Sequence, residues 1–261
     1  MKNIKNIVVV SSGKGGVGKS TVSTNLAISL SQKKLNVGLF DADIYGPSIP
    51  KMLNTTKKPK ISKEKKIIPY ETYGIKSMSI GNLIEETKPV IWRGAMVVRA
   101  LNQMLNDITW GELDFLIIDL PPGTGDIQLS LCQSLNINGA IIVSTPQEIS
   151  LIDVRKAINM FRKVNVRIFG IIENMSFLMQ EKKKIFVFGK DGGLNESKRQ
   201  NISFLGRIPI LPEISSCSDA GKPVVLNQES DATLAYKNIS ENFLKELSKN
   251  VNAEETRIIF E

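Results

Sequence analysis

The chain has 261 residues, of which 42% are hydrophobic and 23% charged, as is ordinary for a folded globular protein. It contains no histidine, which excludes Ser-His and Cys-His nucleophiles and imidazole metal sites, and its two cysteines form no C-x-x-C pair. The net charge of +8 permits an anionic partner without identifying one. No apolar run approaches the ~20 residues of a membrane span, and the apolar stretch 7–10 is too short for a secretory signal. We therefore expect a cytoplasmic protein that does not bind a membrane.

Short β-rich apolar runs alternate with helical patterns along the chain. This alternation predicts an α/β fold of three layers, in which helices cover both faces of a mostly parallel central sheet. The expected strands are 4–10, 37–41, 115–119, 140–144, 166–172 and 202–205, and the expected helices are 19–33, 94–107, 126–135, 149–163, 191–199 and 229–249. We expect a single domain over 1–250, with an irregular insertion at about 54–90 that has room for a short strand pair. The tail 251–261 is expected to be flexible.

The first expected strand is followed by GKGGVGKS, residues 13–20, which satisfies the pattern G-x-x-x-x-G-K-[ST] of a phosphate-binding loop. Glycines let backbone N–H groups surround phosphate oxygens, and the next helix directs its positive end at the same anion. Lys19 is predicted to bridge the β- and γ-phosphates, Ser20 to ligate Mg²⁺ and Thr21 to contact the α-phosphate. The predicted nucleotide contacts in this loop are Gly13, Lys14, Gly15, Gly16, Val17, Gly18, Lys19, Ser20 and Thr21.

Aspartates stand at the carboxyl ends of two predicted strands, in FDAD (Asp41 and Asp43) and in FLIID (Asp119). Open α/β sheets bind ligands at this edge, and a strand-terminal carboxylate commonly holds the Mg²⁺ of a phosphate loop. We therefore predict that Asp41, Asp119 and Ser20 hold Mg²⁺. The segment 121–126, PPGTGD, mixes rigid and permissive residues, which suits a switch loop with two arrangements. Two plainer interpretations stay open: Asp41 as a strand terminus and Asp126 as a helix N-cap.

The phosphate loop carries a second lysine, Lys14, five positions before Lys19. A lysine here could reach the nucleotide of a second subunit, where its positive charge would stabilise the transferring phosphoryl group. A solvated loop lysine explains the residue equally well from the sequence alone.

The motif K-G-G-x-G-K-S resembles the deviant Walker A signature of the ParA/MinD/nitrogenase-iron-protein class, whose members dimerise around two ATP molecules. Longer segments from about residue 4 to 226 are similar to the Mrp/ApbC subfamily of ATP-dependent iron–sulfur cluster carriers. Among them are GKGGVGKST, FDADIYGPSIP, WGELDFLIIDLPPGTGD, IIENMS and SDAGKPVV. The resemblance implies a homodimer that binds and slowly hydrolyses ATP. It also implies that the dimer delivers clusters to apo iron–sulfur client or assembly proteins.

The resemblance also implies roles for particular residues. Lys14, with Lys19 and Asp43, would belong to the catalytic set, Lys14 by contacting the phosphates of the partner subunit. Asp43 would position or deprotonate the attacking water, and Asp119 would be the Walker B aspartate. Asn174 would read the adenine, and the base would pack in the loop 209–212, which begins with Pro209.

One segment departs from the subfamily, which places C-x-x-C between ENMS and a later IFG-like stretch. Here that interval reads FLMQEKKKI, residues 177–185, and contains no cysteine, although thiolates are the expected ligands of iron–sulfur centres. Cys132 lies in an apolar helical pattern and is predicted to be buried. Both cysteines together would give a symmetric dimer four thiolates, enough for one cluster. Of the two, Cys217, in the polar stretch EISSCSDAG, is the better candidate ligand.

Two other functions stay open. A partition or positioning ATPase of the ParA/MinD kind would need a basic amphipathic tail helix or a basic DNA-binding surface. The tail NAEETRIIFE is short and acidic, and the lysines at 57–66 come without arginines, so nucleic-acid binding is not expected. The second alternative is a regulator that binds ATP and dimerises but has lost the cluster.

Overall fold

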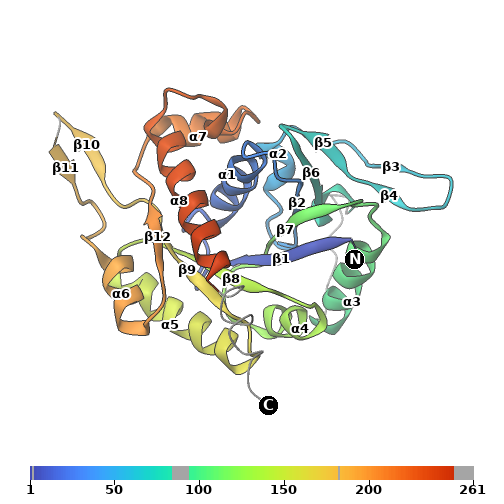
Figure 1. Ribbon diagram of the computed structural model, residues 1–261, viewed down its shortest axis with the longest axis horizontal. Helices are drawn as coiled ribbons and strands as arrows, with labels where there is room; N and C mark the ends of the chain where they lie inside the picture. Colours follow the sequence, from blue (N-terminus) through green and yellow to red (C-terminus); the bar gives the residue numbers. More distant parts are fainter. Residues whose placement is uncertain (2, 84–93, 182, 250–261) are drawn as a thin grey trace, which may run out of the picture.

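A central sheet separates two layers of helices in the computed structural model, which describes residues 1, 3–83, 94–181 and 183–249 (Figure 1). Within these residues the sheet has eight strands in the order β12-β9-β8-β1-β7-β2-β6-β5, and all neighbours are parallel except β5 and β6. The strands are β1 (Ile4–Ser11), β2 (Val37–Asp41), β5 (Tyr70–Thr72), β6 (Ile75–Ser79), β7 (Leu113–Asp119), β8 (Gly139–Ser144), β9 (Ile168–Glu173) and β12 (Phe204–Arg207). This arrangement confirms the predicted fold class.

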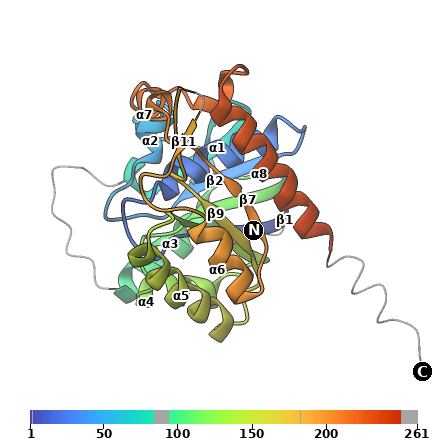
Figure 2. The ribbon, with the colours of Figure 1, turned by 90° about the vertical axis from the view of Figure 1, so that its left-hand side faces the viewer.

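The helices fall on the two faces of the sheet (Figure 2). One face is covered by α3, α4 and α5, and α6 packs on β9 beside α5; the other face is covered by α1 and α8, with α2 and α7 beside them. Their bounds are α1 (Lys19–Ser31), α2 (Ile49–Met52), α3 (Gly94–Asp107), α4 (Asp126–Ser134), α5 (Glu148–Lys163), α6 (Gly192–Gln200), α7 (Pro212–Asp219) and α8 (Asp231–Ser248). Short 3₁₀ turns lie at Ile80–Asn82 and Val224–Leu226.

Strand β1 shows why its apolar run is continuous. Val9 packs into the core on the α3–α5 face, whereas Val8 and Val10 pack into the core on the α1–α8 face, and none of the three is exposed. A strand covered on both faces needs apolar side chains at every position. Each fully buried valine contributes about 1.5–3 kcal/mol relative to an exposed one.

The region 54–90 has the short strand pair that the prediction left room for, but it is more regular than expected. It contains a hairpin of β3 (Lys60–Ile61) and β4 (Ile67–Ile68), and it also supplies β5 and β6 to the main sheet. Strand β6 reads IKSMS, and its polar residues hid it from a search for apolar runs, although four of its five residues are buried. Residues 84–90 of this region, and the expected flexible tail 251–261, lie outside the described residues.

The carboxyl ends of the parallel strands bring the polar residues of the chain together. The register of β2 and β7 places Asp41 opposite Asp119, and that of β8 and β9 places Ser144 opposite Glu173. From the same edge extends a hairpin of β10 (Leu178–Gln180) and β11 (Lys183–Ile185) (Figure 1). We call residues 177–181 and 183–190 the arm. Within the described part of the chain, no helix combines the length and apolar character needed to cross a membrane.

Candidate functional site

The loop between β1 and α1 is held at both of its ends. A Cβ at Gly13 would lie 2.4 Å from the backbone of α5, and a Cβ at Gly18 would lie 2.2 Å from the side-chain nitrogen of Asn174. Gly18 also adopts φ 82° as the N-cap of α1, a conformation that favours glycine. In contrast, nothing lies within 4 Å of a Cβ at Gly15 or Gly16. The loop is therefore packed at its ends and open in the middle, where an anion would meet its N–H groups.

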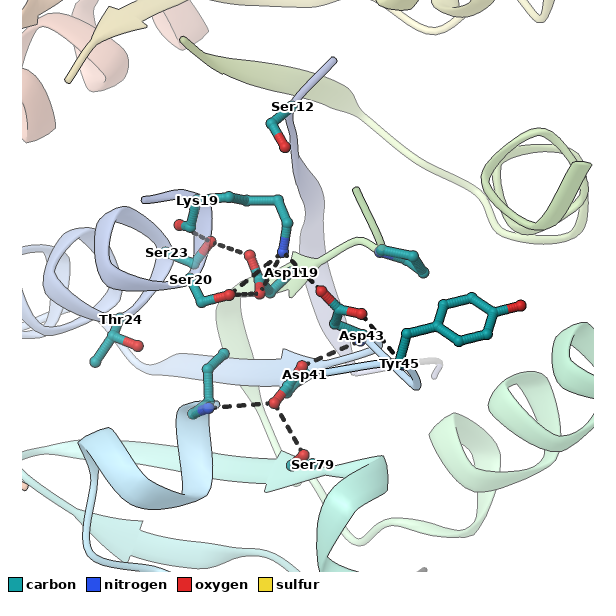
Figure 3. Close-up of polar contacts among 12 residues, drawn as sticks. Ser12, Lys19, Ser20, Ser23, Thr24, Asp41, Asp43, Tyr45, Ser79 and Asp119 are labelled. Atoms are coloured by element: carbon teal, nitrogen blue, oxygen red, sulfur yellow. Dashed lines mark hydrogen bonds and ion pairs between the residues drawn. The ribbon is translucent and has the colours of Figure 1, made fainter. Parts of the chain in front are cut away.

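Lys19, the first residue of α1, reaches back into a buried cluster around Asp119 (Figure 3). Its Nζ lies 2.7 Å from Asp119 Oδ2 and 3.8 Å from Asp43 Oδ2. Ser20 Oγ donates to the same Asp119 Oδ2 at 2.6 Å, and Ser23 Oγ donates to Asp119 Oδ1 at 2.6 Å. Asp119 has no exposed surface, so its charge is balanced by these donors rather than by water.

A cavity of about 200 Å³ lies above this cluster. Its lining combines the loop with residues after β2, in or capping α2, and in the 121–126 segment: Ser12, Lys14, Gly15, Gly16, Gly18, Lys19, Ser20, Thr21, Asp43, Ser48, Met52 and Pro122. The residues fit a phosphate chain with a hard cation, because a lysine, a helix N-terminus, a hydroxyl and a carboxylate converge on one space. Ser20 lines the cavity and contacts Asp119 behind it, so these two residues would supply oxygen ligands to Mg²⁺ there.

Asp41 and Asp43 have different surroundings. Asp43 lines the cavity, and burial raises the pKa of its carboxyl, while Lys19 opposes that rise. Asp41 lies outside the cavity lining and is fully buried. Its carboxyl accepts the N–H groups of Asp43 and Ile49 and the hydroxyl of Ser79. Burial, followed by the charge of Asp119, raises the pKa of Asp41 to about 7.

The prediction that Asp41 holds Mg²⁺ stays a prediction, because neither Asp41 nor Asp119 lines the cavity and both are fully buried. The register places the Asp41 and Asp119 side chains on the same face of the sheet, but the Asp41 carboxyl is bound by Ser79 of β6 whereas that of Asp119 is bound by α1. Asp41 shapes the turn that presents Asp43, which fits the plainer interpretation of a strand terminus.

Lys14 is half-buried, lines the cavity and forms no ion pair with any residue that the structure describes. Its carbonyl accepts the Ser12 hydroxyl at 2.9 Å. The Ser12 carbonyl in turn accepts the Gly123 N–H at 3.0 Å, which ties the 121–126 segment to the start of the phosphate loop. Helix α4 has Gly125 as its N-cap, so Asp126 is an exposed residue of the first turn and not the cap.

Asn174 contacts the phosphate loop, and Pro209 lies in a later segment of the chain. Asn174 Nδ2 donates to the Val17 carbonyl at 2.8 Å, and its backbone N–H donates to the Ser144 carbonyl. Pro209 is buried in the segment after β12, and its neighbour Ile210 donates its N–H to Phe177. Asn174 therefore contacts the loop directly, and Pro209 stays a predicted contact of the base.

The two cysteines lie apart from this cavity. Cys132 is buried in α4, and burial raises the pKa of its thiol to about 12. Cys217, in α7, is half-buried and packs against the core on the α1–α8 face. No group of three or more histidine, cysteine, aspartate or glutamate side chains suited to a metal occurs in the described ranges. One copy of the chain therefore presents no complete ligand set for a cluster within them.

Sequence reasoning missed three residues of this region: Ser23, Ser79 and Glu173. Ser23 follows Lys19 by four positions and so shares its helix face, a spacing that could have indicated it. Glu173 ends the apolar strand IFGIIE, where a charged residue is conspicuous. Ser79 belongs to the strand that the sequence did not predict.

Known proteins match most of the chain. Residues 3–244 match the family described as NUBPL iron-transfer P-loop NTPase, of the ParA group. The iron-sulfur cluster transfer protein NUBPL of Dictyostelium discoideum is 47% identical over 252 residues, which cover 95% of this chain and 78% of that protein. The iron-sulfur cluster carrier protein of Methanocaldococcus jannaschii is 50% identical over 231 residues, covering 87% and 80%.

Solved structures agree with these matches. A nucleotide-binding protein from Archaeoglobus fulgidus in complex with ADP aligns with a TM-score of 0.77 and 37% identity, over 89% of this chain and 92% of that one. The cell division ATPase MinD of Pyrococcus furiosus aligns with a TM-score of 0.70 at 22% identity, over 92% and 99%. The likeness to MinD concerns the fold alone. Because the phosphate loop, the fold and the matched residues agree, this chain belongs to the NUBPL family of iron-transfer P-loop NTPases.

Proposed function

We propose that this protein is an ATP-binding and ATP-hydrolysing iron–sulfur cluster carrier or assembly factor that acts as a homodimer and serves apoproteins. The observation that carries the proposal is the Lys19–Ser20–Asp119 cluster beneath an open phosphate loop, in a chain of the iron-transfer family. The relatives named as cluster carriers and transfer proteins support the cargo.

In this proposal the buried cluster changes partners when Mg²⁺-ATP binds. Lys19 leaves Asp119 for the β- and γ-phosphates, and Ser20 and Asp119 become available to Mg²⁺, which neutralises phosphate charge when bound. Asp43 stands beside Lys19, and its raised pKa makes it a better proton acceptor for an attacking water. Asn174 and Pro209 would contact the base.

A second copy of the chain would complete the site through Lys14. This lysine lines the cavity without a carboxylate partner among the described residues, so its charge is available to a phosphate. A cation supplied by the partner subunit stabilises charge that develops on the transferring group, as arginine fingers do. ATP would thereby join two copies, and hydrolysis would release them.

The cargo step is where this chain differs from the C-x-x-C carriers that it resembles. The arm contains no thiol, and Cys132 is buried with a raised pKa, which leaves Cys217 as the candidate ligand. The same observations favour a second function, an ATP-driven regulator of iron–sulfur proteins that holds no cluster itself. Both candidates share the nucleotide site and differ only in the cluster.

Anaerobic reconstitution with ferrous iron and sulfide separates the two. Iron and sulfide per dimer and the absorption spectrum would be measured for the native protein, for Cys217→Ser and for Cys132→Ser as the matched control. A stoichiometric cluster that only Cys217→Ser loses supports a carrier with relocated ligands. No cluster in any form, with ATP hydrolysis intact, supports the regulator. A native protein that neither binds nor hydrolyses ATP would contradict both.

A further inference from the structure

The arm is attached to the rest of the molecule through one buried carboxylate. Glu173, the last residue of β9, has no exposed surface. Its Oε1 accepts the Ser176 hydroxyl at 2.5 Å, immediately before the arm begins. Its Oε2 accepts the backbone N–H of Gly193 at 2.6 Å, in the first turn of α6 just after the arm ends. A single side chain therefore holds both ends of the arm together.

A cation completes this attachment. Arg207 Nε donates to Glu173 Oε1 at 3.2 Å, and its Nη2 pairs with Asp191, the N-cap of α6. The guanidinium balances a carboxylate that would otherwise be buried and uncompensated. Arg207 belongs to β12, so the attachment joins the ends of β9 and β12 to the start of α6.

The residue after Glu173 belongs to the nucleotide site. Asn174 donates to the Val17 carbonyl of the phosphate loop at 2.8 Å, and its side chain packs against Gly18. Consecutive residues of an extended chain direct their side chains to opposite sides. Glu173 thus faces the arm while Asn174 faces the loop, and one short piece of backbone carries both. A displacement of the loop that moves Asn174 also moves Glu173.

The connection has little room to absorb such a displacement. At the start of α6, a Cβ at Gly192 would lie 2.1 Å from the Pro146 carbonyl oxygen, and one at Gly193 would lie 3.1 Å from Glu173 Cβ. At the base of the arm, the rings of Phe177 and Phe186 meet edge to face with their centroids 6.4 Å apart. Closely packed contacts of this kind transmit shifts because the interior deforms little.

We propose that Glu173 is a positioning residue that couples the phosphate loop to the arm, so that the nucleotide bound at the loop sets the order and orientation of the arm. The inference rests on the proposed function, because it takes the phosphate loop to bind nucleotide, and it adds a route from that site to the segment that in similar carriers bears the C-x-x-C pair. Coupling of this kind requires an element whose arrangement both sites bias, and the Glu173–Asn174 pair is that element.

The substitution Glu173→Gln tests the route. Glutamine keeps the size of the side chain but is neutral, and its amide cannot accept from Ser176, Gly193 and Arg207 together. The matched control is Glu196→Gln. Glu196, like Glu173, is a buried carboxylate bound to an arginine; it is 2% exposed and its partner is Arg155. Glu196 lies in α6 but contacts neither end of the arm.

The measurement is amide hydrogen exchange in the arm of the full-length protein, with and without Mg²⁺ and a non-hydrolysable ATP analogue, beside the Kd of that analogue. In the native protein and in Glu196→Gln, we expect the analogue to slow exchange in the arm by about fivefold or more. In Glu173→Gln, we expect that effect to fall below about twofold, with the Kd changed by less than about threefold. A general folding defect in Glu173→Gln would weaken binding of the analogue as well as its effect on exchange in the arm, so it would not give this result.

Other outcomes overturn the inference. If Glu173→Gln keeps the full nucleotide effect on the arm, the route does not pass through this carboxylate. If the native protein binds the analogue and the arm does not respond, the coupling is absent while the proposed nucleotide site stands. If the native protein does not bind the analogue, the proposed function fails as well. Should Glu173→Gln not fold, Asp191→Asn removes the outer, half-exposed contact of Arg207, and the same loss of the nucleotide effect is expected.

Discussion

The Lys19 ammonium lies 2.7 Å from the Asp119 carboxylate, in an ion pair whose side chains are 6% and 0% exposed. Removing one partner of a buried pair typically costs about 3–5 kcal/mol, because the other charge is left without compensation. Here the pair also occupies the position that nucleotide and Mg²⁺ would take over. In the proposed function the two residues would therefore contribute to folding and to ligand binding through the same contact.

Lys19→Ala is expected to abolish nucleotide binding and to lower the free energy of unfolding by about 2–4 kcal/mol. The Ser20 and Ser23 hydroxyls still donate to Asp119, which keeps the loss below the upper end for a buried pair. Calorimetric titration with ADP and urea unfolding would measure the two effects. Nucleotide affinity within tenfold of the native value would contradict the assigned role of Lys19.

Lys14→Ala is expected to leave nucleotide binding and stability nearly unchanged, because Lys14 has no ion-pair partner in the described chain. ATP hydrolysis and ATP-dependent dimerisation should both be lost. Lys163→Ala, in the last turn of α5, is the control. The measurements are phosphate release and sedimentation with and without ATP, and normal hydrolysis by Lys14→Ala would show that the lysine does not act across a dimer.

Stability should depend on pH through Asp41. Its pKa is raised from 3.8 to about 7, first by burial and then by the charge of Asp119, so the folded protein holds a proton that the unfolded chain releases. The stability from this group is full below about pH 4 and is lost as pH rises through 7. Relative to Asp41→Asn, the native protein should lose on the order of 1–3 kcal/mol between pH 4 and pH 8 in urea unfolding. An equal difference at both pH values would show that Asp41 is ionised throughout.

The two thiols should differ in reactivity. Burial raises the pKa of Cys132 to about 12, so at pH 8 it is a buried, neutral thiol that reacts poorly. Half-buried Cys217 should react first. A thiol-specific chromogenic reagent should therefore titrate one thiol per native chain and two in urea, with Cys217→Ser showing none in the native state. Two fast thiols in the native protein would count against the packing of α4.

The tip of the arm offers a gain-of-function test. Gln180 and Lys183 are direct cross-strand partners in the β10–β11 hairpin and have the spacing of a C-x-x-C pair. We expect Gln180→Cys with Lys183→Cys to acquire an iron–sulfur cluster shared between two copies on anaerobic reconstitution. Met179→Cys with Lys184→Cys is the control, because these residues also face each other but lack that spacing. Equal cluster content in the two double variants would mean that any thiols on the arm suffice.

The sequence predicted most of the fold because its strands are apolar on both faces and because α3, α5 and α8 have periodic apolar faces. It did not predict α2 and α7, which are too short for a periodic pattern, or β6, whose lysine and serines interrupt the apolar signal. The phosphate loop was predicted because glycine, lysine and serine are needed there at fixed spacing. The different partners of Asp41 and Asp43 could not be predicted, because two aspartates two residues apart at a strand end look alike in the sequence.

Pairings between distant residues account for the rest. Glu173 meets Gly193 and Arg207 only after β9, β12 and α6 have come together. Local sequence patterns indicate a charged residue at the end of a strand, but they do not indicate which distant residue balances its charge.

The glycines of the phosphate loop differ in how closely the rest of the protein packs against them. Gly13 packs directly against α5 and Gly18 against Asn174, so the methyl group of an alanine at either position would clash with its neighbour. The middle of the loop is open, so a methyl group added at Gly15 would contact no neighbouring atom. We therefore expect alanine to be tolerated at Gly15 but not at the closely packed positions Gly13 and Gly18. We also expect any movement of the loop on nucleotide binding to be confined to its few central residues, because its two ends are closely packed.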